Sequence, residues 1–222
     1  MSLQIEIDRI SFGYESSSLL FEEFSLSLVG GSSVALVGES GSGKSTLLNL
    51  IAGLEIPNSG SIKVFNTRLD TLSSAELNIY RRDRLGFIFQ TFHLIPHLTV
   101  LQNIMVPGLL TDDSFSNIEK KAIELLRVLR LDKRKGALPA NLSGGEKQRT
   151  CIARALMNDP SIILADEPTG NLDQLNTTTV IDSLLDRCKL RNVTLIIATH
   201  SPTIADKMDT SITISNQRIV PV

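Results

Sequence analysis

The sequence lacks several features that would each mark a particular class of protein. Its 222 residues include only two cysteines, Cys151 and Cys188, whose surroundings show no metal-binding spacing. A reduced, cytosolic environment is therefore expected. The net charge is −2, so the chain lacks the overall positive field that is typical of nucleic-acid-binding proteins. No nucleic-acid partner is expected.

Long apolar runs are also missing. Runs such as SVALVG, SIILAD and VTLIIAT are short, whereas about 20 apolar residues are needed to cross a bilayer. The first ten residues, MSLQIEIDRI, alternate apolar and charged side chains and do not resemble a signal peptide. If the protein acts at a membrane, we expect a separate subunit to supply the membrane-spanning part.

The apolar segments that are present predict an α/β fold. SVALVG, SIILADEP and VTLIIATH are continuous apolar stretches, and the last two flank the helical segment TTTVIDSLLDRCKL. This rhythm is typical of a mainly parallel sheet that is covered on both faces. Alternating apolar residues in QIEIDRI and FEEFSLSLVGG predict antiparallel strands near the N-terminus. SITISNQRIV predicts a final pair of strands.

Residues 91–154 have a different pattern. They contain no strand-like apolar run, and apolar side chains recur on one helical face from Ile118 to Leu129. We therefore predict one domain of 222 residues, in which a catalytic core of residues 1–90 and 155–222 carries an inserted helical subdomain.

The stretch GESGSGKST contains the phosphate-loop pattern G-x-x-x-x-G-K-[ST], with Gly38, Gly43, Lys44 and Ser45 in the defining positions. Such glycines let backbone N–H groups surround a phosphate at a helix N-terminus. Lys44 can reach the β- and γ-phosphates, and Ser45 can hold Mg²⁺. The alternative is a Gly/Ser-rich turn before an ordinary helix. It is disfavoured because an apolar strand precedes the loop and the helical segment LLNLIAG follows it.

A second apolar strand ends in two acidic residues, Asp166 and Glu167. Ligands of open α/β sheets bind at the carboxyl ends of the strands. We expect Asp166 to hold Mg²⁺ through water and Glu167 to polarise the attacking water. An acidic cap for the next turn would be the simpler reading of this pair alone. Its combination with a phosphate loop favours nucleotide hydrolysis.

The segment SGG, residues Ser143, Gly144 and Gly145, stands at the head of a helical pattern about a hundred residues after the phosphate loop. A hydroxyl, two glycines and a helix N-terminus are suited to bind a phosphate. One chain would then carry two phosphate-binding segments, the phosphate loop and SGG, each of which forms half of a site for a triphosphate. The simplest arrangement is a head-to-tail pair of copies, each of which covers the nucleotide of the other.

These motifs together resemble the nucleotide-binding subunit of an ATP-binding cassette (ABC) transporter, and the resemblance covers essentially the whole chain. LSGGE at residues 142–146 resembles the family signature, with Glu146 in place of the commoner Gln. FIFQ ends in Gln90, which matches the glutamine loop that faces the membrane subunit. NLD at residues 171–173 matches the loop that crosses the dimer interface, and His200 matches the switch histidine that contacts the γ-phosphate.

The resemblance implies a role for each matching residue. Tyr14 would stack on adenine, as an exposed aromatic ring can. His93 and His97 are expected to be structural or surface residues. ATP and Mg²⁺ are the implied cofactors. The implied site residues are Gln90, Glu167 and His200 for catalysis, Ser45, Gln90 and Asp166 for Mg²⁺, and Tyr14, Gly38, Ser40, Gly41, Gly43, Lys44, Ser45, Thr46, Ser143, Gly144, Gly145 and Asp173 for ATP.

The branch of the family is indicated by FIFQTFHLIPHLTVLQNIMVP and ADEPTGNLD, which resemble the lipoprotein-releasing and macrolide-efflux subunits. This implies a transmembrane permease as partner and a peripheral position on the cytoplasmic face of the membrane. Two alternatives stay open: a soluble ABC ATPase that serves a cytosolic assembly, and a regulator of cell-wall hydrolases. A chromosome-maintenance cassette is disfavoured because no long coiled coil separates the motifs, and a tandem-cassette factor because only one set of motifs is present. The cargo is not encoded in such a subunit.

Overall fold

Two sheets and a layer of helices make up the structure, a computed structural model that describes residues 3–15, 18–170, 174–215 and 218–221. The larger sheet has the strand order β10-β9-β3-β8-β7-β6, and the smaller has the order β2-β1-β4-β5. The strands are β1 (Leu3–Phe12), β2 (Phe21–Val29), β3 (Ser33–Val37), β4 (Ser59–Val64), β5 (Thr67–Arg68), β6 (Leu85–Ile88), β7 (Ile162–Asp166), β8 (Thr194–Thr199), β9 (Thr210–Ser215) and β10 (Arg218–Pro221).

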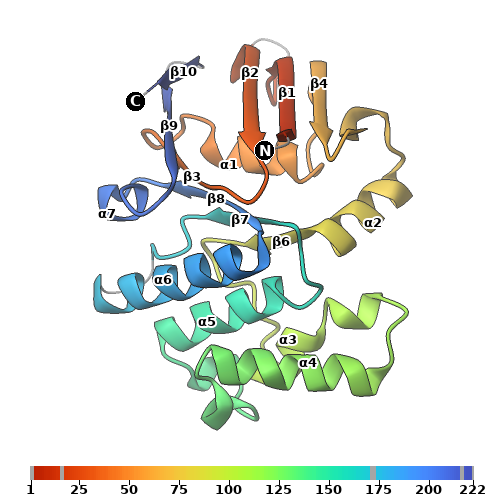
Figure 1. Cartoon of the computed structure of the whole chain (residues 1–222), viewed down its shortest axis with the longest axis vertical. Helices are drawn as coiled ribbons and strands as arrows, with labels where there is room; N and C mark the ends of the chain where they lie inside the picture. Colours follow the sequence, from red (N-terminus) through yellow and green to blue (C-terminus); the bar gives the residue numbers. More distant parts are fainter. Residues whose placement is uncertain (1–2, 16–17, 171–173, 216–217, 222) are drawn as a thin grey trace.

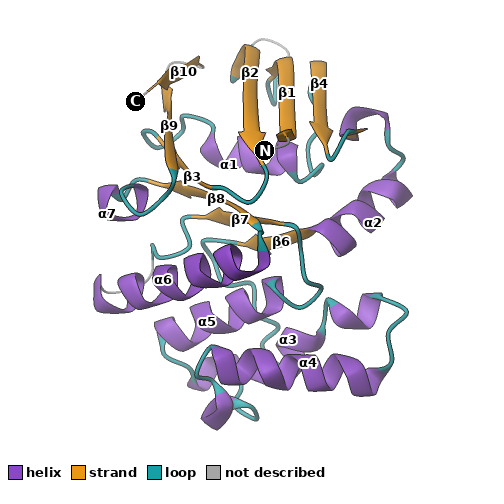
Figure 2. Cartoon of the chain, viewed as in Figure 1, coloured by secondary structure: helices purple, strands orange, loops and turns teal. Residues whose placement is uncertain are grey.

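The helices lie mostly at the other end of the molecule from the smaller sheet (Figure 1), and Figure 2 shows this separation of strands from helices by colour. They are α1 (Lys44–Ile51), α2 (Ser74–Arg84), α3 (Val100–Met105), α4 (Phe115–Val128), α5 (Gly144–Ala155), α6 (Gln174–Arg191) and α7 (Pro202–Ala205), with short 3-10 helices at Leu69–Thr71, Gly108–Leu110, Asp132–Arg134 and Pro139–Asn141.

The larger sheet is parallel from β9 to β6. Its last strand, β10, pairs antiparallel with β9, and these two strands form the final pair predicted from SITISNQRIV. Every residue of β8 is buried. The smaller sheet is antiparallel in each of its pairings, which confirms the prediction for the N-terminal segments. The expected α/β fold, with a mainly parallel core sheet, is therefore confirmed.

The parallel sheet separates two apolar clusters, and alternation along its strands supplies both of them. Ile162 and Leu164 on β7 pack with α1 and the smaller sheet, whereas Ile163 and Ala165 pack with α3, α4, α5 and α6. Successive side chains of a strand point to opposite faces, so the middle of a strand that is buried on both sides is expected to be apolar. This requirement explains the continuous apolar runs of the sequence.

In the described structure, residues 91–154 contain helices and no strand, as expected. Ile118, Ala122, Leu125 and Leu129 are all buried. They share one apolar cluster with residues of β6, β7, β8 and α6, and α5 contacts both β6 and α6. The helical segment thus packs directly on the parallel sheet. Its division from the core as a subdomain stays a prediction.

Side chains fix several helix starts. Ser73 accepts a hydrogen bond from the backbone N–H of Glu76, whose carboxylate accepts from the backbone N–H of Ser73. The same reciprocal arrangement starts α3 at Thr99 and α5 at Ser143. Each satisfies backbone N–H groups that have no partner within the helix. The start of α5 is therefore fixed by its own first turn.

A buried amide holds the loop that leads into α3. Asn103 is fully buried, and its side-chain oxygen accepts from the backbone N–H of Ile95 at 2.8 Å. Its side-chain nitrogen donates to the carbonyls of Leu98 at 2.9 Å and of Thr99 at 3.1 Å. One side chain thus closes residues 95–99 into a fixed turn.

We expect Asn103→Ala to lower the free energy of unfolding by about 2 to 3 kcal/mol, because it leaves backbone groups of this turn unpaired and a small cavity in the helical layer. Urea denaturation monitored by circular dichroism measures the change. Asn117→Ala on the exposed face of α4 is the matched control, with an expected change within about 0.5 kcal/mol. Equal stabilities for the two variants would contradict this role of Asn103.

Candidate active site

A cleft of about 700 Å³ opens at the carboxyl edge of the parallel sheet, where β3, β7 and β8 end side by side. Segments far apart in the sequence meet there, because parallel strands place their carboxyl ends at one edge. The lining residues include all the predicted site residues outside the signature and the NLD loop: Tyr14, Gly38, Ser40, Gly41, Gly43, Lys44, Ser45, Thr46, Gln90, Asp166, Glu167 and His200.

Two glycines of the phosphate loop have backbone angles that favour glycine. Gly43, the residue before α1, has a φ of 100°, and a Cβ atom there would lie 2.8 Å from the ring of Phe21. Gly41 has a φ of 80°, with no atom within 4 Å of the position of a Cβ. L-residues rarely adopt such angles. The loop can therefore direct the N-terminus of α1 into the cleft, where its dipole favours an anion.

Lys44 is buried at the centre of this loop. Its Nζ atom donates hydrogen bonds to the backbone carbonyls of Gly38 and Glu39, each at 2.8 Å. The ammonium group thus lies within the curve of the loop rather than in solvent. A fixed positive charge and the N-terminus of α1 converge on the same part of the cleft, which suits it to bind a phosphate group.

Two side chains that directly follow the neighbouring strands β7 and β8 form an acid–imidazole pair in the cleft. The Oε1 atom of Glu167 lies 2.8 Å from Nδ1 of His200, and the Glu167 side chain is mostly buried while His200 is exposed. The backbone N–H of Glu167 donates to the carbonyl of Ala198 at 2.9 Å. Glu167 has a φ of 42°, an unusual angle for a residue with a side chain, and such angles recur at functional sites.

Gln90 and Tyr14 also line the cleft. A Cβ atom built on Gly170 would lie 3.6 Å from Nε2 of Gln90, so the amide lies close to the turn that follows Glu167. The hydroxyl of Tyr14 lies 3.2 Å from Oγ1 of Thr46, and its exposed ring contacts Phe12 edge-on. The ring is thus held beside the phosphate loop. Its stacking on adenine stays a prediction.

The signature residues Ser143, Gly144 and Gly145 lie at the start of α5 and do not line this cleft. Their role in binding the nucleotide of a second copy stays a prediction. Asp173 and the rest of the NLD segment lie outside the described residues. His93 and His97 are exposed, as predicted.

The structure adds an ion pair that the sequence did not reveal. Nε of Arg134 donates to Oε1 of Glu146 at 2.7 Å, and the backbone N–H of Ser143 donates to Oε2 at 2.8 Å. The Arg134 guanidinium, with the help of these hydrogen bonds, holds the pKa of the Glu146 carboxyl below its usual range. The pair joins residues that are twelve positions apart on separate elements, so no local sequence pattern indicates this contact.

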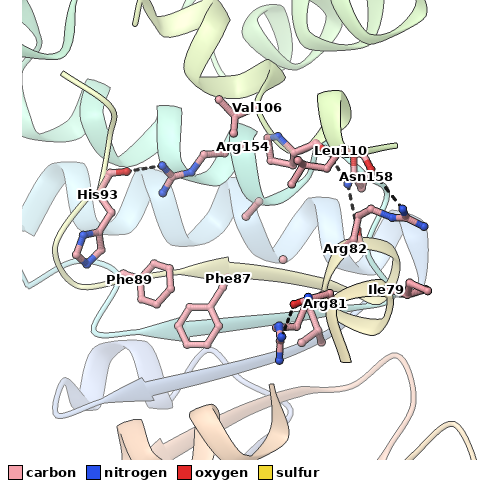
Figure 3. Close-up of a pocket in the computed structure, with 15 residues that line it drawn as sticks. Ile79, Arg81, Arg82, Phe87, Phe89, His93, Val106, Leu110, Arg154 and Asn158 are labelled. Carbon is pink, nitrogen blue, oxygen red and sulfur yellow. Dashed lines mark hydrogen bonds between the residues drawn. The ribbon is translucent and has the colours of Figure 1, made fainter. Parts of the chain in front are cut away.

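A second groove, of about 720 Å³, lies between α2, β6 and the end of α5 (Figure 3). The rings of Phe87 and Phe89 stack at a centroid distance of 4.2 Å along one side of it. Arg81, Arg82 and Arg154 are among the other lining residues. The groove therefore combines an aromatic wall with positive charge. It was missed because its walls come from separate elements.

The end of α5, which lines the groove, is bonded to the segment that follows Gln90, a residue of the cleft. Arg154 donates from Nη1 to the carbonyl of His93 at 2.6 Å (Figure 3) and from Nη2 to the carbonyl of Phe92 at 3.0 Å. The thiol of Cys151 also donates to the Phe92 carbonyl, at 3.1 Å, and burial raises its pKa to about 11. The helix that begins with the signature is thus fastened to the segment that follows Gln90.

Comparison with known proteins identifies a matching family and similar sequences. The profile of a family described as ABC transporter matches residues 21–170. The lipoprotein-releasing system ATP-binding protein LolD of Treponema pallidum (strain Nichols) is 48% identical over 176 residues, which are 79% of this chain and 78% of the relative. The LolD protein of Xanthomonas axonopodis pv. citri (strain 306) is 42% identical over 190 residues, 86% of this chain and 78% of the relative.

A solved structure extends the likeness to three dimensions. The dimeric structure of the ATP-binding cassette MJ0796, in a post-hydrolysis state bound to ADP and Pi, matches with a TM-score of 0.89 at 33% identity. The match covers 97% of this chain and 96% of that one. The chain therefore belongs to the ABC transporter family and is one of its ATP-hydrolysing cassettes.

Proposed function

We propose that this chain is the ATPase subunit of a lipoprotein-releasing system, bound to the cytoplasmic face of a membrane through a separate transmembrane subunit. The Glu167 carboxylate carries the catalytic part of this proposal, because His200 holds it beside the phosphate loop. The identities of 48% and 42% to LolD proteins support the choice of branch. In the part of the chain that the structure describes, no helix is long and apolar enough to cross a bilayer.

The donors of the cleft fit ATP with Mg²⁺. Lys44 and the N-terminus of α1 would bind the β- and γ-phosphates. Ser45, Gln90 and Asp166 offer hydroxyl, amide and carboxylate oxygens, the ligands that Mg²⁺ prefers. The described residues contain no cluster of three or more His, Cys, Asp or Glu that could hold a metal alone, which suits an ion that reaches the site on phosphates. Bound Mg²⁺ would neutralise charge on the phosphates.

The reaction is hydrolysis of the γ-phosphate. A water molecule attacks the γ-phosphorus while Glu167 accepts a proton from it. The bond to the oxygen that bridges the β- and γ-phosphorus atoms breaks, and ADP and phosphate result. His200 orients the Oε1 atom of Glu167 through their 2.8 Å contact. Lys44 stabilises the charge of the phosphate oxygens during the transfer.

We further propose that a second copy completes the site. Ser143 is exposed at the N-terminus of α5, where backbone N–H groups and the helix dipole favour a phosphate. Gly144 and Gly145 would allow close approach of the γ-phosphate of the other copy, and Asp173 would lie at the same interface. The dimeric state of the cassette MJ0796 supports this arrangement. Closure of the pair would then depend on bound ATP.

The second groove is the proposed docking place of the transmembrane subunit. Its aromatic wall and its arginines suit a segment with both apolar and acidic side chains. Ile79, a groove residue on α2, is 51% exposed although it is apolar. Arg154 connects the groove to the segment after Gln90. Movement of α5 on dimer closure would therefore reach the membrane subunit.

We expect Glu167→Gln to lower steady-state ATP hydrolysis by at least about 10²-fold, because the neutral amide cannot accept a proton from water. The affinity for a fluorescent ATP analogue should change little, since Lys44 and the phosphate loop are intact. Glu124→Gln, on the exposed face of α4, is the matched control and should hydrolyse ATP normally. Unchanged hydrolysis in Glu167→Gln would contradict the assignment of the general base.

We expect Ile79→Glu to abolish co-isolation of the tagged protein with its membrane partner from detergent-solubilised host membranes, because the new carboxylate would face the acidic segment of that partner. Leu190→Glu on α6 is the control, since Leu190 is 81% exposed and lies outside the groove. Both variants should melt like the parent. Mass spectrometry of the companions also separates the alternatives: a soluble partner alone would support the assembly ATPase and overturn membrane docking.

A further inference from the structure

The signature of this chain contains a carboxylate where a phosphate is expected to bind. Glu146 lies in the first turn of α5, at the helix end that the proposed function directs at the triphosphate of a second copy. A carboxylate close to a triphosphate repels it, and the repulsion is strong where water is excluded. Something must offset this charge if the pair of copies is to close on ATP.

Arg134 is placed to do so. Its Nε atom contacts Oε1 of Glu146 at 2.7 Å, whereas Oε2 is engaged by the backbone N–H of Ser143. The Glu146 side chain is only 16% exposed, and that of Arg134 is 48% exposed. The guanidinium therefore contacts the largely buried carboxylate while about half of the Arg134 side chain still faces solvent.

The position of Arg134 is fixed by its own element. Arg134 ends the 3-10 helix Asp132–Arg134, and its backbone N–H donates to the carbonyl of the fully buried Leu131 at 2.8 Å. Its carbonyl accepts from the backbone N–H of Ala137 at 2.9 Å. Lys147, the next residue on α5 after Glu146, places its Nζ atom 6.0 Å from the centre of the Phe92 ring. Arg134 is thus preorganised beside Glu146.

Stability does not account for the pair. A partly exposed ion pair contributes little to the free energy of unfolding. The capping role of Glu146 needs only one side-chain oxygen, and glutamine can perform it. What the arginine changes is the net charge at the N-terminus of α5.

We propose that Arg134 neutralises Glu146, so that the signature segment can bind the γ-phosphate of ATP held by a second copy. Arg134 is then a positioning residue for closure of the pair, acting through Glu146. This inference rests on the proposed head-to-tail function. It goes beyond that function in assigning a role to a residue outside the family motifs, and in tying that role to the one position where the signature departs from the commoner sequence.

The test uses the Glu167→Gln protein, in which bound ATP should persist, and measures ATP-dependent dimerisation by analytical ultracentrifugation. Adding Arg134→Gln should weaken dimerisation by about tenfold or more, because it leaves the Glu146 charge uncompensated against the triphosphate. Adding Glu146→Gln as well should restore the affinity to within about threefold of the parent, because no charge then needs compensation. The melting temperature should stay near that of the parent in each variant.

Lys133→Gln is the matched control, because it removes an exposed positive charge from the same 3-10 helix. It should leave dimerisation nearly unchanged. If the Glu167→Gln parent dimerises with ATP but Arg134→Gln does not weaken it, the inference is wrong and the proposed function stands. Failure of Glu146→Gln to restore the double variant would also overturn it. If the parent does not dimerise with ATP at all, the head-to-tail proposal and this inference both fail.

Discussion

Burial of the parallel strands on both faces is the constraint on which the rest of the structure depends. β7 and β8 are apolar between their ends, because one set of side chains packs with α1 and the smaller sheet and the other with the helical layer. Polar groups can therefore appear only where the strands end. Asp166, Glu167 and His200 stand at or just after such strand ends. The parallel direction of the strands brings them to the same edge of the sheet, where the phosphate loop also lies.

The sequence predicted what depends on local patterns. The loop from Gly38 to Thr46 and the strand that ends in Asp166 could both be predicted from adjacent residues, because backbone geometry and strand burial impose short-range rules. The 2.8 Å contact between Glu167 and His200 could not be read in this way, although both residues were named. It depends on the relative position of two strands, which only the packed sheet determines.

The dependence on packing between elements also explains which features could not be predicted from the sequence. The Arg134–Glu146 pair joins a 3-10 turn to a helix start, and the second groove takes its walls from α2, β6 and α5. Both arise where elements pack, and a surface arginine or an exposed isoleucine has no distinctive sequence pattern. Arg154 shows why such contacts matter, because it fastens the signature helix to the segment after Gln90. The hydrogen bonds of Arg154 thereby link the signature helix and the second groove to the segment that leads from the nucleotide cleft.

In the proposed head-to-tail pair, one cleft is only half of a working site. The most direct test is the rate of ATP hydrolysis as a function of protein concentration, with ATP and Mg²⁺ in excess. We expect the rate to rise with about the second power of protein concentration at low concentration, and to become linear once pairs predominate. If the rate were strictly proportional to protein concentration throughout, and sedimentation showed the chain to be monomeric, hydrolysis would not require a second copy.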